Sequence, residues 1–201
     1  EEYNGSAWTN GGNLGTARQR LAGCGTQTAG LAFGGEPTPN ATEEYNGTAW
    51  TGGGNLTTGR FYPGGAGTQT AGLAFGGRAP AISNATEEYN GTAWTNGGNL
   101  TTARNQLAGC GLQTAALAFG GQSPGVTGAT ELYNGTAWTT TTSLNTARER
   151  LAGAGNLTTA DAYIAGCGTQ TAALSAGGGA VPAATFEYDG SSWTGGGNLN
   201  V

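Results

Sequence analysis

The segment Glu44-Tyr45-Asn46-Gly47-Thr48-Ala49-Trp50 decides the fold, because close copies of it recur along the whole chain. The copies are centred on five tyrosines, which are Tyr3, Tyr45, Tyr89, Tyr133 and Tyr188. Successive tyrosines lie 42, 44, 44 and 55 residues apart. Each is followed, five residues later, by one of the five tryptophans of the chain, Trp8, Trp50, Trp94, Trp138 and Trp193. A fixed period of this length indicates a repeat protein in which each repeat is one supersecondary unit.

Each repeat predicts four short antiparallel strands. In the first copy these are 21–25, 28–33, 41–45 and a strand that carries Trp50, with a tight turn at Thr26-Gln27 and a break at Gly34-Gly35. On the second strand Ala29, Leu31 and Phe33 share one face, because side chains alternate along a strand. Asn46-Gly47 between two strands is a strong hairpin signal, in which both turn residues are expected to take a positive φ.

Four antiparallel strands in about 44 residues, ending with a tryptophan, are typical of a propeller blade. Glycine makes up 41 of the 201 residues, about three times its usual share. Glycine and alanine would let the inner strands converge near a central axis, while large aromatic side chains fill the wider space between blades. A β-solenoid is the competing fold, but its coils are shorter and need no Asn-Gly hairpin in every period. We therefore expect an all-β propeller of four-stranded blades.

The spacing of Gly35, Tyr45 and Trp50 resembles a Kelch repeat, as does an arginine before each first strand (Arg18, Arg60, Arg104 and Arg148). More narrowly, the wording Thr-Glu-Glu-Tyr-Asn-Gly-Thr-Ala-Trp resembles Kelch-like repeats in virion proteins of marine tailed phages. The resemblance covers essentially the whole chain. It implies a Kelch-type propeller located in a virion, as a non-enzymatic tail fibre, appendage or decoration protein.

The partners implied by this resemblance are other virion proteins, copies of the same chain, and cell-surface polysaccharide bound as a receptor. A secreted or cell-surface lectin or adhesion propeller is the alternative. A carbohydrate-active enzyme is a third hypothesis, and a designed consensus repeat protein a fourth.

The repeat divides the chain into a half blade and four blades, whose ranges are 1–14, 15–56, 57–100, 101–144 and 145–201. We expect five blades, with six as the alternative. The 55-residue spacing indicates either an insertion of about 11 residues or two repeats that lack 33, and we favour the insertion. A chain that begins at Glu1, within a repeat, is expected of a fragment or a processed product.

Composition argues against several classes of function. The chain has no histidine, and all seven of its cationic side chains are arginines. Ser-His-Asp catalysis, imidazole metal sites, the copper site of galactose-oxidase-type propellers and lysine Schiff bases are therefore not expected. The net charge of -5, with scattered arginines, does not suit nucleic acid, and no apolar run is long enough for a membrane span. We expect no catalytic residue, cofactor or metal.

Several repeated polar residues have structural interpretations. Arg18, Arg60, Arg104 and Arg148 are expected to pair with the glutamate before each tyrosine (Glu44, Glu88, Glu187) and so tie adjacent blades, although an arginine cluster also binds carboxylates. Neighbouring carboxylates such as Glu43-Glu44 and Glu87-Glu88 point to opposite faces of a strand and suggest a solvated edge. Cys24, Cys110 and Cys167 share one repeat position and are expected to be small buried side chains. Nine Asn-x-Ser/Thr sequons are by-products of the repeat.

The loops between the second and third strands differ in every copy, and their ranges are 36–40, 78–84, 122–128 and 179–183. We expect them on one face of the disc, together with the connections between blades and the extra segment 156–163. Divergent loops on a repeated frame are typical of a binding face, while drift in unconstrained loops is the alternative. The candidate ligand-binding residues are Glu36, Pro37, Arg78, Pro80, Gln122, Ser123, Asp161 and Tyr163.

Overall fold

The structure is a computed structural model that describes residues 1–3, 5–78, 80–149, 151–153, 164–169, 172–176 and 185–196. All regular secondary structure in these residues is β. Three sheets have four antiparallel strands, in the pairing order β3-β4-β5-β6, β7-β8-β9-β10 and β11-β12-β15-β16. A fourth sheet has the order β17-β18-β19-β20-β21, and β1-β2 and β13-β14 are separate two-stranded ribbons.

The strands are short, as the repeat predicts. The first ribbon and the first sheet comprise β1 Glu2–Tyr3, β2 Trp8–Thr9, β3 Ala22–Thr26, β4 Ala29–Phe33, β5 Thr42–Tyr45 and β6 Trp50–Gly52. The second sheet comprises β7 Gly64–Gly67, β8 Gly72–Phe75, β9 Thr86–Tyr89 and β10 Trp94–Asn96. The third comprises β11 Ala108–Leu112, β12 Ala115–Phe119, β15 Thr130–Tyr133 and β16 Trp138–Thr141, with the ribbon β13 Gln122–Ser123 and β14 Gly125–Val126 between its halves. The fourth comprises β17 Leu151–Gly153, β18 Ile164–Thr169, β19 Ala172–Ala176, β20 Thr185–Tyr188 and β21 Trp193–Gly195.

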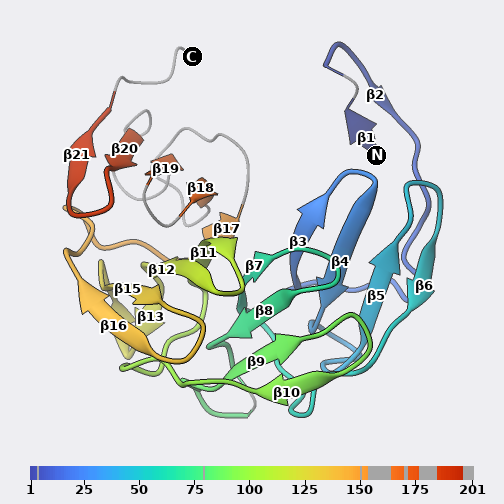
Figure 1. The fold of residues 1–201 in the computed structure, drawn as a ribbon, viewed down its shortest axis with the longest axis horizontal. Helices are drawn as coiled ribbons and strands as arrows, with labels where there is room; N and C mark the ends of the chain where they lie inside the picture. The colour runs from blue at the N-terminus through green and yellow to red at the C-terminus, as the bar shows by residue number, and fades with distance from the viewer. Residues whose placement is uncertain are drawn as a thin grey trace.

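The sheets are arranged around a common centre, like the blades of a propeller (Figure 1). Strands β3, β7 and β11 lie toward the middle, and β6, β10 and β16 lie at the periphery. Neighbouring inner strands contact each other, β3 with β7 and β7 with β11. The all-β class and the repeated four-stranded sheets are therefore confirmed.

The two hairpins of the first sheet differ from the prediction in their turns. The first turn lies at Gln27-Thr28, one residue later than predicted, because Thr26 pairs with Ala29. The second loop spans four residues, since Tyr45 pairs with Trp50. In it Gly47 has a φ of 88°, but Asn46 is not among the residues with positive φ. The expectation of two positive φ values is wrong because the Asn46 side chain closes the loop, its Oδ1 accepting hydrogen bonds from the backbone N–H groups of Thr48 and Ala49.

The two ends of the array differ from its middle. The ribbon β1–β2 has the same register as an outer hairpin, with Tyr3 opposite Trp8, but it pairs with no further strand among the described residues. In the fourth sheet β17 adds a fifth strand, parallel to β18. The four-strand prediction is therefore wrong for this sheet, because Leu151–Gly153 and Ile164–Thr169 both form strands before the second hairpin strand.

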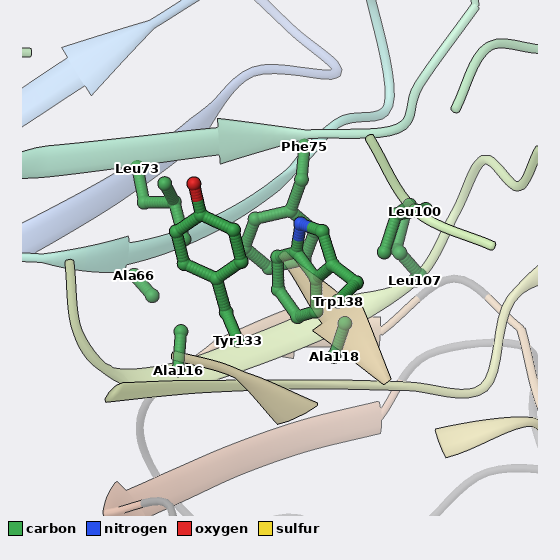
Figure 2. Packing of buried hydrophobic residues seen from close by; sticks show 9 residues of the cluster. All are labelled: Ala66, Leu73, Phe75, Leu100, Leu107, Ala116, Ala118, Tyr133 and Trp138. Carbon is green, nitrogen blue, oxygen red and sulfur yellow. The ribbon is translucent and has the colours of Figure 1, made fainter. Parts of the chain in front are cut away.

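Each large core side chain packs between two neighbouring sheets. Between the second and third sheets, Phe75 of β8 lies against Trp138 of β16, with ring centroids 4.8 Å apart (Figure 2). Phe33 and Trp94 repeat this contact at 5.0 Å, and Phe119 and Trp193 repeat it at 5.3 Å. Each aromatic side chain removes roughly 150–250 Å² from water. The prediction that aromatic residues fill the space between blades is confirmed for these three pairs.

Trp8 does not follow this pattern and is 66% exposed, whereas Trp94 is only 4% exposed. A buried tryptophan of the repeat packs on the phenylalanine of the preceding sheet, as Trp94 does on Phe33. Trp8 belongs to the ribbon β1–β2, which is not part of a larger sheet among the described residues. The expectation that every repeated tryptophan fills a space between blades is therefore wrong at this end.

Glycines of the inner strands leave space for the phenylalanine side chain of the preceding sheet. A Cβ added to Gly65 would lie 2.9 Å from Cζ of Phe33, and one added to Gly109 would lie 2.2 Å from Cζ of Phe75. Such distances are too short for any side chain. These inner-strand glycines are therefore required by the aromatic ring of the preceding blade. This reason is more specific than the one expected from composition, in which glycine lets the inner strands approach each other near a central axis.

A tyrosine–glutamate hydrogen bond ties each outer hairpin to the preceding one. The hydroxyl of Tyr89 donates to Glu44 at 2.5 Å, and that of Tyr133 donates to Glu88 at 2.5 Å. Tyr45 donates to Glu2 in the same way. Glu44 and Glu88, two of the three glutamates expected to bind arginine, thus tie adjacent blades through tyrosine instead.

The third sheet breaks this pattern and compensates for the break. Leu132 stands where the earlier repeats have Glu44 and Glu88, so Tyr188 has no carboxylate to bind. Thr141 stands where they have Gly53 and Gly97, and its Oγ1 lies 3.2 Å from the Tyr188 hydroxyl. A Cβ on Gly53 would lie 2.8 Å from the Tyr89 hydroxyl, so the glycine is needed only where the carboxylate occupies the space.

This exchange predicts strong coupling between Glu44→Leu and Gly53→Thr. Gly53→Thr alone should destabilise the chain by about 1–3 kcal/mol, because overpacking displaces the Tyr89–Glu44 hydrogen bond. The double variant copies the third blade. Its loss in free energy of unfolding should be smaller, by at least about 1 kcal/mol, than the losses of the two single variants added together. Urea unfolding of the four chains measures this, and additive losses would contradict the compensation.

Candidate functional site

A buried arginine clamps both ends of the variable loop 78–84. Nη1 of Arg60 donates to the carbonyls of Gly76 (2.9 Å) and Ala85 (2.8 Å), which flank the loop 78–84. Its Nη2 donates to Glu87 at 2.5 Å, in a pair whose two side chains are each 1% exposed. We call this arrangement the loop clamp.

The loop clamp is repeated in the other two complete repeats. Arg18 binds the carbonyls of Gly34 and Ala41 and the carboxylate of Glu43, at 2.8, 2.9 and 2.9 Å. Arg104 binds the carbonyls of Gly120 and Ala129 and the carboxylate of Glu131, at 2.7, 2.6 and 2.8 Å. The clamp holds the loop ends in the same way whether the loop has five residues, as in 36–40, or seven, as in 78–84 and 122–128.

The predicted partners of these arginines are therefore wrong. The guanidinium groups of Arg18, Arg60 and Arg104 each bind the glutamate two residues before the tyrosine, within their own sheet. It is the backbone of Arg60 and of Arg104 that ties adjacent blades, since their carbonyls accept hydrogen bonds from Gly35 and Gly77 of the preceding repeat. Glu43 and Glu44 do point to opposite faces, because Glu43 binds Arg18 and Glu44 binds Tyr89. The predicted solvated edge is also wrong, since Glu43 and Glu87 are buried and each meets a guanidinium.

The fourth repeat replaces the acid with an aromatic ring. Phe186 stands at the position of Glu43, Glu87 and Glu131. The guanidinium of Arg148 lies over the Phe186 ring, 4.7 Å from its centroid. Burial lowers the pKa of Arg148, and it is also the main cause that lowers the pKa of Arg104, where Glu131 acts in the opposite direction.

The predicted binding residues that the structure describes lie on the loop face, which we define as the face formed by 36–40, 78–84 and 122–128. Pro37 is exposed, and Glu36 forms an ion pair with Arg20 at 2.8 Å. Gln122 and Ser123 form β13. Arg78 and Pro80 lie together, since Nε of Arg78 donates to the Pro80 carbonyl at 3.0 Å. Asp161, Tyr163, the segment 156–163 and the loop 179–183 lie outside the described residues.

A cavity of about 790 Å³ opens on the loop face between the first and second sheets. It is lined by the end of the first loop, the connection between the sheets and the second loop: Pro39, Asn40, Thr58, Gly59, Phe61, Arg78 and Pro80. Its volume lies in the range of small-molecule sites, about 300–1,000 Å³. The structure thus brings Arg78 and Pro80 into one site, and Glu36, Pro37, Gln122 and Ser123 are not among its lining residues.

Sequence reasoning missed the contribution of Thr58 and Phe61 to this cavity. A signal for Phe61 was available, because the two residues after each clamp arginine differ in every repeat. These pairs are Gln19-Arg20, Phe61-Tyr62, Asn105-Gln106 and Glu149-Arg150.

The second residue of each described pair in the complete repeats has a left-handed backbone. The φ angles of Arg20, Tyr62 and Gln106 are 63°, 57° and 56°. The backbone N–H of Tyr62 donates to the Arg20 carbonyl, and that of Gln106 donates to the Tyr62 carbonyl. A non-glycine residue in this region costs roughly 1–3 kcal/mol, and such strain gathers at functional sites. Its repetition beside the variable loops supports the loop face as the functional one.

Cys24 does not have the character of a reactive thiol. Burial raises its pKa to about 12, which keeps it protonated at neutral pH. Cys110 is buried as expected, while Cys24 is only partly buried. No group of three or more potential metal ligands occurs within the described residues. None of these residues forms a helix long and apolar enough to cross a membrane.

No protein-family model matches the chain, and no curated protein matches it.

The buried clamp predicts a large difference between two arginines. Arg104→Met should lower the free energy of unfolding by about 3–5 kcal/mol, because it leaves the Glu131 carboxylate buried without its counter-ion. Arg20→Met, which breaks the exposed pair with Glu36, should cost less than about 1 kcal/mol. Chemical unfolding at neutral pH compares them, and similar losses would mean that the clamp contributes no more than a surface ion pair.

The tyrosine–glutamate bonds predict a loss of stability in alkali. Burial and the neighbouring carboxylate raise the pKa of Tyr89 and of Tyr133 to about 12, above the unfolded value of about 10. The folded chain therefore retains protons that the unfolded chain loses, so this contribution is complete below about pH 10 and is lost as the pH rises toward 12. Tyrosinate absorbance and urea unfolding between pH 8 and 12 measure the effect.

Tyr133→Phe should flatten the fall in stability above pH 10. Tyr62→Phe is the control, because the Tyr62 hydroxyl has no hydrogen-bond partner among the described residues. Full ionisation of every tyrosine near pH 10 in the folded chain would contradict the assignment.

Proposed function

We propose that the chain is a non-enzymatic binding module of the Kelch-type propeller class, with five blades, whose loop face binds glycan on a host surface. The setting we propose is a viral particle, in which the module belongs to a tail fibre, appendage or decoration protein. This setting rests on the resemblance of the repeat wording to phage virion proteins. Its other contacts would be with virion proteins or with copies of itself.

The observation that carries the binding role is the loop clamp. The clamp of Arg60, Glu87 and the loop-end carbonyls recurs with the same three contacts in each complete repeat. The residues between the clamped ends differ in sequence and in length. A rigid scaffold can present variable recognition surfaces when the ends of its loops are held in the same way whatever the loop sequence. Drift of unconstrained loops explains their variety but does not explain a 790 Å³ cavity formed where two of them meet.

A non-enzymatic role is supported by the use of the acidic side chains. General acid–base catalysis by carboxylates needs two of them beside one substrate. Glu43, Glu87 and Glu131 are instead held in buried ion pairs with arginine. Glu44 and Glu88 accept hydrogen bonds from tyrosine between blades. The chain also has no histidine or lysine to act as a base or nucleophile.

A secreted or cell-surface lectin is the second candidate function. It would use the same loop face for the same class of ligand, so the loop observations favour the two equally. Attachment of the parent protein to a larger assembly separates them, and purified particles that carry this chain would favour the viral setting.

Binding of the folded chain to a panel of bacterial surface polysaccharides and intact cells tests the proposal. Saturable binding should be abolished when the sequence 78–84 is replaced by that of 36–40, because the clamp accepts either loop but the recognition residues change. Leu112→Thr is the control, because it changes a residue at the other end of the strands, beside the hairpin turn. The first two repeats already have threonine at this position, Thr26 and Thr68. No binding by a folded sample, or equal loss in the control, would reject a receptor role for the loop face.

A further inference from the structure

The cavity between the first and second sheets combines an aromatic ring, a cation and neutral polar groups. Phe61 and Arg78 lie opposite each other in an isolated antiparallel bridge, with backbone N–H to carbonyl distances of 3.1 and 2.9 Å in the two directions. Residues opposite each other in such a pair project to the same face. Both side chains line the cavity, which gives it an apolar wall beside a positive charge.

Among the described arginines, Arg78 differs in that its terminal nitrogens are uncommitted. Arg18, Arg60 and Arg104 are held in the loop clamps, and Arg20 is paired with Glu36. Arg78 is exposed and forms no ion pair with the residues that the structure describes. The hydrogen bond from its Nε to the Pro80 carbonyl orients the guanidinium and leaves Nη1 and Nη2 available to a ligand.

The equivalent bridges in the neighbouring repeats carry other side chains. The first repeat places Gln19 opposite Glu36, and the third places Asn105 opposite Gln122. The backbone is the same, so the aromatic–cation pair is a property of the second repeat alone among these three. The site is therefore a specific one and is not generated by the repeat.

The geometry points to a carboxylated saccharide as the occupant of this cavity, an inference that rests on the proposed glycan-binding function and names its ligand class. A guanidinium fork binds a carboxylate bidentately. The ring of Phe61 and the rings of Pro39 and Pro80 supply an apolar surface for the C–H face of a sugar. Asn40 and Thr58 supply neutral hydrogen-bonding groups for its hydroxyls.

The charge of the whole chain makes this assignment selective. At a net charge of -5 the protein repels polyanions in general. Binding of an acidic sugar would therefore depend on the single guanidinium of Arg78, because the chain has no broadly basic surface to attract it. An acidic peptide would meet the same cation, but it offers no ring face to the apolar walls and fewer hydroxyls to Asn40 and Thr58, so the saccharide fits the site better.

Calorimetric titration of the folded 201-residue chain with trigalacturonic acid tests the inference. The comparison probes are its methyl ester, a neutral galactose trisaccharide and triglutamate. The key variants are Arg78→Gln and Phe61→Asn, which introduce the residues that the third repeat holds at the same backbone positions. Arg20→Gln is the control, because it changes the net charge equally on the same face but removes an arginine that Glu36 already binds.

Trigalacturonic acid should bind saturably, and Arg78→Gln should weaken it by at least about tenfold, since charge-assisted hydrogen bonds are the strong ones. Phe61→Asn should weaken it severalfold, and Arg78→Lys should fall between the wild type and Arg78→Gln because it keeps the charge without the fork. Arg20→Gln should remain within twofold of the wild type. The ester and the neutral sugar should bind the wild type at least about tenfold more weakly than the acid does, a comparison that needs no variant to fold.

Four results would overturn the inference. Equal losses in Arg78→Gln and Arg20→Gln would assign the effect to net charge, and triglutamate binding as tightly as the sugar would assign the site to acidic peptides. If trigalacturonic acid fails while another glycan of the panel binds through the loop 78–84, the ligand class is wrong and the proposed function stands. If no glycan binds at all, the proposed function fails with it.

Discussion

The fold depends on one contact, the packing of a phenylalanine of one sheet into a space that glycine leaves in the next. Phe75 lies between Gly109 and Trp138, both in the third sheet. Without the glycine, the ring would collide with a Cβ at 2.2 Å, and without the ring, Trp138 would lose its partner. With few charged residues in the chain, such contacts must supply most of its stability. The high glycine content is thus a condition for aromatic packing and is compatible with a close-packed core.

Changes between the repeats are compensated where they affect this packing. Leu132 removes the carboxylate that Tyr188 would bind, and Thr141 supplies a hydroxyl in the space that glycine leaves elsewhere. Phe186 removes the acid that Arg148 would bind, and its ring lies under the guanidinium instead. In both cases the buried polar group keeps a partner, because leaving it without one costs about 1–3 kcal/mol or more. At these two places the frame varies in pairs, whereas the loop face varies residue by residue.

Much of the fold follows from the sequence, because the period and the alternation along Ala29–Phe33 are strong local signals. The two turns were predicted less well, since the role of the Asn46 side chain depends on loop length. The partners of the clamp arginines were predicted wrongly, because Glu43 and Glu44 alternate across the strand and the sequence does not reveal which one faces inward. The cavity was predicted only in part: Arg78 and Pro80 stood out in a variable loop, but Phe61 enters through a backbone bridge between segments that are distant in sequence.

The place of the cavity follows from the same frame. A loop clamped at both ends by Arg60 cannot move its stems, so sequence changes act only on the side chains between them. The connection that carries the clamp arginine also carries Phe61, one residue later, which lies opposite Arg78 of the clamped loop. The clamp therefore positions one wall of the cavity directly and the other through the loop that it holds. A binding site between two blades is the expected outcome, because the clamp brings the two variable segments together there while the tyrosine–glutamate bond at the outer hairpins keeps the two sheets in register.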